Sequence, residues 1–387
     1  NVERLEQIIA KERPDALLPN LGGQSGLNLC SELAAAGVLD RYNVKVIGVQ
    51  VDAIERGEDR IEFKKTMNKL GIEMARSEVA YSVEDALAIA DKLGYPVVLR
   101  PAYTMGGAGG GLVYNVEELK TVCERGLQAS LVGQVLVEES ILGWEELELE
   151  VVRDAKNNMI TVCFIENIDP LGVHTGDSFC SAPMLTISEE CQKRLQEQAY
   201  KIVESVQVIG GTNVQFAHDP VTDRIIVIEI NPRTSRSSAL ASKATGYPIA
   251  RVATKIAIGY HLDEIPNEVT GETMACFEPA LDYVTVKFPK WPFDKFVYGR
   301  RKLGTQMKAT GEVMAIGRNF EQALMKAVRG AEISQNSLNM KKLAPMSVEE
   351  LREKILAQDD ERLFAIYESF KRGVTVAEIH ELTKIDE

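Results

Sequence analysis

Two strand-like segments joined by a short turn constrain the fold of this chain most strongly. TNVQFAHD (212–219) and DRIIVIEINPR (223–233) are rich in β-branched and apolar residues, and the connection from Pro220 to Asp223 is typical of a turn. The pattern predicts an antiparallel β-hairpin. If its turn is centred near residue 222, Gln215 lies opposite Glu229.

The same hairpin carries a group of polar side chains. Side chains alternate between the two faces of a strand, so Glu229 and Asn231 share a face. Gln215 would complete a patch of one carboxylate and two amide oxygens, which are ligands that Mg²⁺ accepts together with substrate phosphates. An E-x-N pair alone is common on protein surfaces. Here Arg233 and Arg236 follow at once, and the combination predicts a metal–phosphate site at a strand end.

A glycine-rich segment, RPAYTMGGAGGG (100–111), follows the strand-like run PVVLRP. Glycine lets backbone N–H groups approach a phosphate closely. The chain has no Gly-Lys dipeptide, which excludes a P-loop, and the glycine spacing does not fit G-x-G-x-x-G at the start of a helix. With Arg100 at the end of the strand, the segment predicts a loop that contacts the phosphates of a nucleotide.

The 387 residues exceed what one hydrophobic core usually holds, and the pattern changes twice along the chain. Residues 1–56 alternate helix and strand as in a parallel α/β unit, with DALLPNL (15–21) as an expected strand. Residues 57–332 have an α+β pattern, and residues 333–387 are almost wholly helical. The expected fold is therefore α/β and α+β, followed by an all-α segment.

Two local patterns give further expectations. EELELEVV (145–152) alternates with period two, which predicts a strand with one buried and one solvent-exposed face. Thr186 and Glu189 have the spacing of a capping box ahead of a long amphipathic helix. Both features lie between the glycine-rich segment and the hairpin.

Composition excludes several classes of protein. The net charge of −13 and the absence of a basic tract argue against nucleic-acid binding. The sequence contains no run of 18 apolar residues, which a membrane span would need. The charged N-terminus is unlike a signal peptide. The six cysteines form no C-x-x-C pair, which indicates reduced, mostly buried residues and a cytoplasmic protein.

Several motifs together resemble one family. R-P-x-x-T-M-G-G-x-G-G-G, E-x-x-x-G-W-x-E, G-x-H-T-G-D-S, N-V-Q-F-A and E-x-N-P-R-x-S-R-S-S-A-L-A-S-K-A-T-G are similar to the amino-terminal, carboxyphosphate-forming half of carbamoyl phosphate synthetase large subunits. The similarity covers nearly the whole chain. It implies an ATP-grasp fold, in which ATP lies between two α+β lobes. It also implies a partial pre-ATP-grasp domain (1–56), a carboxyphosphate synthetic domain (57–332) and the start of an oligomerisation domain (333–387).

The resemblance also implies roles for individual residues. It assigns the metal ions to Gln215, Glu229 and Asn231, and catalysis to Glu229, Asn231 and Arg233. The residues that it assigns to the nucleotide are Arg60, Arg100, Gly106, Gly107, Glu139, Ile141, Glu146, Gly172, Val173, His174, Gln215, Glu229 and Arg233. Within that set, Glu146 would hold the ribose, and Glu139 and Ile141 the adenine. His174 alone of the four histidines gains a functional role from its motif.

The implied reaction is ATP-dependent phosphorylation of bicarbonate to carboxyphosphate, which then meets ammonia from a glutaminase subunit. The implied cofactors are ATP, Mg²⁺ or Mn²⁺, and K⁺, and the implied pathways are arginine and pyrimidine biosynthesis. Homo-oligomers through the helical segment are a further expectation. Compared with the family, a βαβ unit before Asn1 and a second synthetase half after Glu387 are absent. Two alternatives remain: another ATP-grasp ligase or carboxylase component, or an inactive nucleotide-binding and assembly module.

Overall fold

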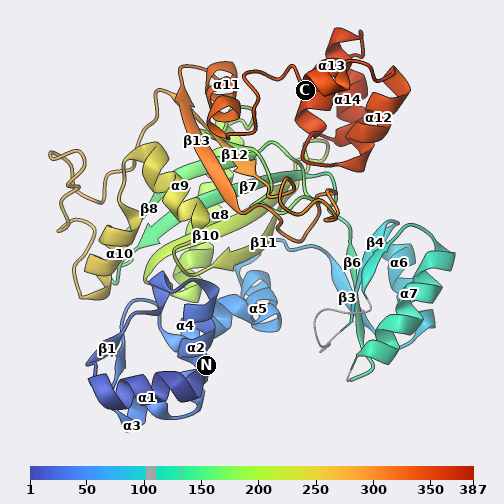
Figure 1. Cartoon of the computed structure of the whole chain (residues 1–387). Coiled ribbons are helices and arrows are strands. Elements are labelled where there is room, and N and C mark those ends of the chain that lie inside the picture. The colour runs from blue at the N-terminus through green and yellow to red at the C-terminus, as the bar shows by residue number, and fades with distance from the viewer. Residues whose placement is uncertain (102–109, 131) are drawn as a thin grey trace. The chain divides into compact units, whose positions relative to one another are not determined.

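The computed structural model describes residues 1–101, 110–130 and 132–387, which form two compact units (Figure 1). The larger unit contains residues 1–72 and 143–387, and the smaller contains residues 73–142. The mixture of parallel α/β, antiparallel α+β and helical segments confirms the expected fold class. Among the described residues, no helix is long and apolar enough to cross a bilayer.

The N-terminal segment begins the larger unit. Its elements are α1 (Val2–Glu12), β1 (Ala16–Leu17), η1 (Pro19–Leu21), α2 (Gly23–Ala35), α3 (Val38–Arg41), β2 (Lys45–Val46), α4 (Val51–Glu58) and α5 (Arg60–Leu70). Strands β1 and β2 pair in parallel, as expected. The strand expected over 15–21 is shorter than predicted, because Pro19 lacks an N–H and the chain turns into a 3₁₀ helix there.

One buried side chain connects this segment to the main sheet. The Nδ2 atom of Asn20 donates to the carbonyl of Ile209 at 3.0 Å, and its Oδ1 atom accepts from the N–H of Val49 at 2.8 Å. Asn20 is 2% exposed. Its side-chain amide therefore fixes the start of α2 beside the strand that follows Ile209.

A seven-stranded sheet forms the centre of the larger unit. Its spatial order is β11-β10-β7-β8-β9-β12-β13, and its neighbouring pairs with a described register are antiparallel. The strands are β7 (Glu145–Arg153), β8 (Met159–Asn167), β9 (Cys180–Ala182), β10 (Gly210–His218), β11 (Ile225–Asn231), β12 (Val284–Lys290) and β13 (Gly311–Gly317). The predicted hairpin is β10–β11, and Gln215 pairs with Glu229 as expected.

Helices cover both faces of this sheet (Figure 1). Thr161 of β8 bonds to Tyr200 of α8 (Glu189–Val206) on one face. On the other, α9 (Arg236–Thr245) and α10 (Ile249–Ala257) pack against the neighbouring residues Ile160 and Val162. The expected solvent-exposed face of 145–152 is therefore wrong, because both faces of β7 are buried.

The capping box expected at Thr186 is also wrong. The N-cap of α8 is Ser188, whose Oγ atom accepts from the N–H of Cys191 at 3.1 Å. The Thr186 hydroxyl donates instead to the carboxylate of Glu166 on β8. This partner is distant in sequence, so local spacing could not reveal it.

The helical C-terminal segment packs on the β12–β13 end of the sheet. Its elements, with the preceding helix, are α11 (Phe320–Gly330), η3 (Lys341–Leu343), α12 (Val348–Ala357), α13 (Arg362–Lys371) and α14 (Val376–Thr383). Phe364 belongs to one hydrophobic core with Phe288 of β12. A buried ion pair joins Arg362 to Asp169, so this segment is anchored by charge as well as by apolar contact.

The smaller unit is a four-stranded antiparallel sheet with two helices. Its order is β3-β6-β4-β5, and its core contains apolar residues of both helices and all four strands. The elements are β3 (Ser77–Ala80), α6 (Val83–Leu93), β4 (Val97–Pro101), β5 (Gly111–Val113), α7 (Val116–Ala129) and β6 (Val135–Glu139). Ser82 caps the start of α6 and Gly94 ends it, and both residue types favour these positions.

Candidate active site

The open end of the β10–β11 hairpin brings the predicted metal ligands together. Gln215 and Glu229 are paired across the two strands, and Asn231 is two residues farther along the same face. The Nδ2 atom of Asn231 lies 3.4 Å from Glu229 Oε1. Glu229 is exposed and Gln215 is half-buried, so their oxygen atoms can reach a ligand from solvent.

Arg233 lies beside this patch and is held by side chains from two directions. Its Nη2 atom donates to Asn231 Oδ1 at 3.3 Å, and its Nε atom donates to Gln24 Oε1 at 3.1 Å. Gln24 in turn donates to Glu58 Oε2 at 2.8 Å. Burial raises the pKa of Glu58, and Glu229 raises it further, whereas Gln24 and Arg233 lower it. The guanidinium is thus oriented at a fixed position next to the predicted metal ligands.

A polar network adjoins the patch on the same face of the sheet, which is the face of β7 that was expected to be exposed. The Asn213 amide donates to the carboxylates of Glu148 (2.9 Å) and Glu150 (2.8 Å). Asn167 also donates to Glu148 at 2.9 Å, and the Ser238 hydroxyl donates to Glu150 at 2.9 Å. These bonds explain how carboxylates are buried here, because burying a charge without partners is very costly.

Glu146, also on β7, differs from Glu148 and Glu150. It is 5% exposed, and its Oε2 atom is buried without a hydrogen-bond partner among the described residues. Burial raises its pKa well above the ordinary value, Glu148 and Glu229 raise it further, and Lys287 lowers it. A buried acceptor without a donor is a position where a ligand hydroxyl or a cation would be stabilised.

The loop with the G-x-H-T-G-D-S motif lies against the start of β7. The N–H of Gly143 donates to the carbonyl of Leu171 at 3.0 Å, and the N–H of Leu171 donates to Trp144 at 2.9 Å. Gly172 follows with φ of 122°, a conformation that favours glycine. Val173 is buried and His174 is half-buried. The larger unit therefore brings this predicted nucleotide segment next to the strand that carries Glu146.

The side chain of His174 accepts a hydrogen bond from its own loop. Its Nδ1 atom accepts from the N–H of Gly176 at 2.9 Å, so the ring is held close to the backbone. Lys287 of β12 donates to the carbonyl of Thr175 at 2.6 Å and supports the same loop from the sheet. The two hydrogen bonds therefore fix the loop at the neighbouring residues Thr175 and Gly176.

Other predicted residues lie elsewhere in the chain. Arg60 is exposed as the first residue of α5. In the smaller unit, Arg100 at the end of β4 lies 3.5 Å from Glu138, and Ile141 follows β6. Gly106 and Gly107 lie outside the described residues.

The carboxylate of Glu139 is fully engaged within the smaller unit. It accepts from Arg76 through the backbone N–H at 2.9 Å and through the guanidinium at 2.8 and 3.0 Å. The backbone N–H of Glu139 donates to the carbonyl of Arg76 at 2.8 Å.

Sequence reasoning did not identify several residues of the site. Alternation along β7 was interpreted as one exposed face, so Glu148 and Glu150 were missed. Their partner Asn213 on β10 was missed with them. Gln24 lies in the turn Gly22–Gly26 at the carboxyl end of an expected strand, a position that is equally typical of a ligand site and of an ordinary tight connection. Nothing local marked Glu58.

The buried carboxyl of Glu150 gives a testable pH dependence. Burial raises its pKa from the ordinary 4.5 to about 7, against the lowering effect of hydrogen bonds from Ser237, Asn213 and Ser238. The folded chain then holds this proton more tightly than the unfolded chain, so stability falls as pH rises from about 4.5 to about 7. Glu150→Gln should remove a dependence of about 1.4 kcal/mol per pH unit in that window.

Urea unfolding at pH 5 and pH 7, without nucleotide or divalent cation, measures this difference. The matched control is Glu353→Gln, which changes an exposed carboxylate of α12. The control should show the same change of unfolding free energy with pH as the unaltered chain. Glu146 and Glu58, whose pKa values are also raised, contribute to that change in all three proteins. Parallel pH profiles for Glu150→Gln and the unaltered chain would contradict the assignment.

Comparison with known proteins identifies the family. The ATP-binding domain of the carbamoyl-phosphate synthase L chain matches residues 59–265, which is more than half of the chain. The chain belongs to this family. Its preATP-grasp domain matches residues 1–56, and the oligomerisation domain of the large chain matches residues 312–387.

Curated relatives agree with this assignment. The chain is 54% identical over 384 residues to the carbamoyl phosphate synthase large chain of Clostridium acetobutylicum, and 55% identical over 385 residues to that of Thermomicrobium roseum. The alignments cover 99% and 100% of this chain, but only 36% of each relative. The chain therefore spans about a third of the length of the curated relatives it matches.

Solved structures show that the fold extends beyond this family. Biotin carboxylase of Campylobacter jejuni is similar with a TM-score of 0.65 and 16% identity, over 98% of this chain and 85% of that one. The biotin carboxylase domain of Hydrogenobacter thermophilus 2-oxoglutarate carboxylase has a TM-score of 0.59 and 21% identity, over 76% and 63% of the two chains. At this identity the likeness describes the fold alone.

Proposed function

We propose that this chain transfers the γ-phosphate of ATP to bicarbonate and forms carboxyphosphate, the first step of carbamoyl phosphate synthesis. The observation that carries the proposal is the arrangement of Gln215, Glu229, Asn231 and Arg233 at the open end of β10–β11. Family membership and the identity to carbamoyl phosphate synthase large chains support it. The similarly folded carboxylase domain of Hydrogenobacter thermophilus was crystallised with MgADP and bicarbonate.

The donor set fits a hard divalent cation. Gln215, Glu229 and Asn231 offer one carboxylate and two amide oxygens on one accessible face, and Mg²⁺ accepts such ligands together with phosphate oxygens. When bound, the cation would neutralise charge on the β- and γ-phosphates. Mg²⁺ or Mn²⁺ for these ligands, and K⁺ in addition, are the proposed cofactors.

The nucleotide assignments follow the same proposal. The unpartnered carboxylate oxygen of Glu146 would accept from ribose hydroxyls, with Gly172, Val173 and His174 lining the pocket. The backbone of Glu139 and Ile141 would meet the adenine. The phosphates are assigned to Arg60, Arg100, Gly106 and Gly107. The proposed domains are 1–56, 57–332 and 333–387, with nucleotide binding in the second.

The chemistry requires neutralisation of charge more than proton transfer. A bicarbonate oxygen attacks the γ-phosphorus, the bond from that phosphorus to the leaving ADP oxygen breaks, and carboxyphosphate and ADP result. Bicarbonate is already an anion, so no strong base is needed. Arg233 would hold it against the polyanionic nucleotide, and the hydrogen bonds to Gln24 and Asn231 fix the guanidinium in advance.

The remaining family features are part of the proposal. Ammonia, supplied by a glutaminase small subunit, would attack the carbon of carboxyphosphate and displace inorganic phosphate to give carbamate. The helical segment 333–387 would contribute to a homo-oligomer, in agreement with the oligomerisation-domain match over 312–387. A second phosphorylation by this chain alone is not proposed, because the sequence contains one E-x-N-P-R site.

The experiment is an ADP-release assay with ATP, Mg²⁺ and K⁺, with and without bicarbonate and with no biotin present. The proposal expects ATP hydrolysis that bicarbonate stimulates, because carboxyphosphate hydrolyses in water. Stimulation that requires added biotin would favour a carboxylase component. Calorimetric ATP binding without any bicarbonate-dependent turnover would favour an inactive nucleotide-binding module.

A further inference from the structure

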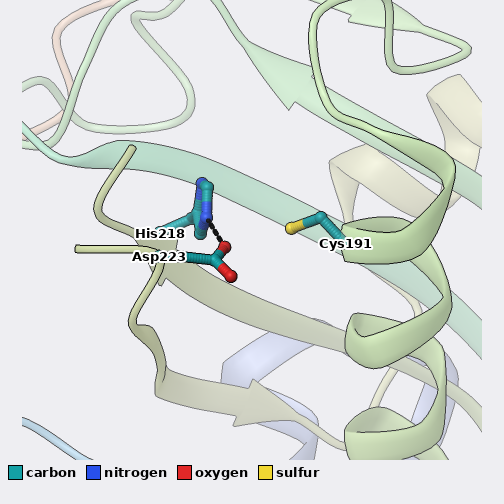
Figure 2. A group of neighbouring side chains, drawn as sticks. All are labelled: Cys191, His218 and Asp223. Atoms are coloured by element: carbon teal, nitrogen blue, oxygen red, sulfur yellow. Dashed lines mark hydrogen bonds and ion pairs between the residues drawn. The ribbon is translucent and has the colours of Figure 1, made fainter. Parts of the chain in front are cut away.

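A second cluster of metal-binding side chains lies at the closed end of the same hairpin, three residues beyond Gln215. Figure 2 shows Cys191, His218 and Asp223 with their functional groups directed toward one another. One ligand atom from each of the three residues lies within 4.8 Å of the other two. They come from three places in the chain: the first turn of α8, the last residue of β10, and the turn before β11.

The histidine of this cluster is held on both sides by carboxylates. Its Nε2 atom lies 2.8 Å from Asp223 Oδ1, and its Nδ1 atom lies 2.5 Å from Glu145 Oε2. A metal-binding histidine commonly donates its second ring N–H to a carboxylate, which fixes the tautomer and the ring orientation. Glu145, the first residue of β7, is placed for that role, which leaves Nε2 facing Asp223.

Burial and access also suit a metal ion. Cys191 is 4% exposed and His218 is 8% exposed, whereas Asp223 lies at the surface. Arg194 bonds to the other oxygen of Asp223 at 2.7 Å and to its carbonyl at 3.1 Å, which holds the turn in place. An ion can therefore enter past Asp223 while the sulfur and ring donors remain in a fixed, largely dry setting.

We propose that Cys191, His218 and Asp223 bind a divalent transition metal ion of the zinc class, with Glu145 as the positioning residue for His218. One sulfur, one nitrogen and one carboxylate oxygen are a donor set that Zn²⁺ accepts and Mg²⁺ does not favour. Water at the exposed side would supply the fourth ligand. The site is separate from the oxygen-ligand patch at Gln215 and Glu229, and its chemistry does not depend on the proposed function.

A metal ion binds a neutral imidazole ring and a thiolate, so Zn²⁺ binding at this cluster should weaken as pH falls.

The test is a titration of the chelator-stripped, reduced protein with Zn²⁺ alone in the presence of excess Mg²⁺, which occupies hard oxygen sites. We expect one Zn²⁺ per chain and a rise in melting temperature. Co²⁺ in place of Zn²⁺ should give a thiolate charge-transfer absorption. Absence of a stoichiometric binding event in the folded protein would overturn the proposal.

Matched variants separate this site from adventitious binding. Cys191→Ser should abolish the charge-transfer band, and Asp223→Asn, at an exposed position, should weaken Zn²⁺ binding at least tenfold. Cys276→Ser and Asp282→Asn alter a cysteine and an exposed aspartate elsewhere and should leave binding unchanged. Glu229→Gln should also leave it unchanged. Zn²⁺ binding that survives both Cys191→Ser and Asp223→Asn would contradict the assignment.

Discussion

Glu229→Gln is expected to lower bicarbonate-stimulated ATP turnover by roughly 10²- to 10³-fold and to raise the Mg²⁺ concentration for half-maximal activity by about tenfold or more. Glu229 is the only carboxylate of the predicted ligand set, and it lies exposed across from Gln215. Replacing it with an amide keeps the size and removes the charge. The fold should be unaffected, because the strand is held by its pairing to β10 and by its buried isoleucines.

The measurement is the ADP-release rate as a function of Mg²⁺ concentration. Glu321→Gln, an exposed carboxylate in the first turn of α11, serves as the matched control and should behave as the unaltered chain. An unchanged Mg²⁺ requirement in a folded Glu229→Gln variant would show that the metal is held elsewhere.

Arg233→Ala should reduce bicarbonate stimulation by about 10³-fold, because the cation that offsets the approach of two anions is removed. Arg233→Lys should recover only part of the loss. Lysine keeps the charge but cannot donate to both Gln24 and Asn231 from a planar group, as the guanidinium does. ATP affinity should fall much less than the stimulated rate if the main role of Arg233 is toward bicarbonate.

Steady-state kinetics with bicarbonate and ATP varied separately distinguish these effects. Arg251→Ala is the control, since Arg251 of α10 is exposed and forms an ion pair with Glu268. If Arg233→Ala leaves the bicarbonate response intact, Arg233 does not hold bicarbonate and the proposed mechanism is wrong at that step.

The hairpin and the pairing of Gln215 with Glu229 were predictable from a turn centred near residue 222. The register shift between Gln215 and Phe216 was not, although this irregularity brings Glu229 rather than Ile228 opposite Gln215. The same reasoning located Asn231 and Arg233, because they lie within four residues of Glu229. Local rules also explain the N-caps of α6 at Ser82 and of α14 (Val376–Thr383) at Thr375, because both side chains can accept from a backbone N–H of the first turn.

Features that depend on distant segments were not predictable. Period-two alternation in β7 shows that two faces differ, but not whether the polar face is covered. Here Asn213 and Ser238 cover it and supply the donors that Glu148 and Glu150 require. The Arg233–Gln24 bond joins residues 209 positions apart.

The zinc-class cluster was missed for a similar reason. The spacing of cysteines along the chain reveals only local pairs such as C-x-x-C. Cys191 lies near His218 and Asp223 because α8 packs against the hairpin. Contacts between distant segments therefore create this cluster, the polar network around Glu148 and Glu150, and the Arg233–Gln24 bond. Local propensity does not predict them.

The central claim is that bicarbonate itself attacks the γ-phosphate, and oxygen-isotope transfer tests it most directly. The chain would be incubated with ATP, Mg²⁺, K⁺ and fresh ¹⁸O-labelled bicarbonate in unlabelled water, and the phosphate released would be analysed by mass spectrometry. Attack by bicarbonate places its oxygen between carbon and phosphorus, and decomposition of carboxyphosphate to CO₂ leaves that oxygen on phosphate. The account predicts one ¹⁸O atom in the phosphate formed by the bicarbonate-stimulated reaction. Phosphate that carries only water oxygen would show that water is the nucleophile and would contradict the account.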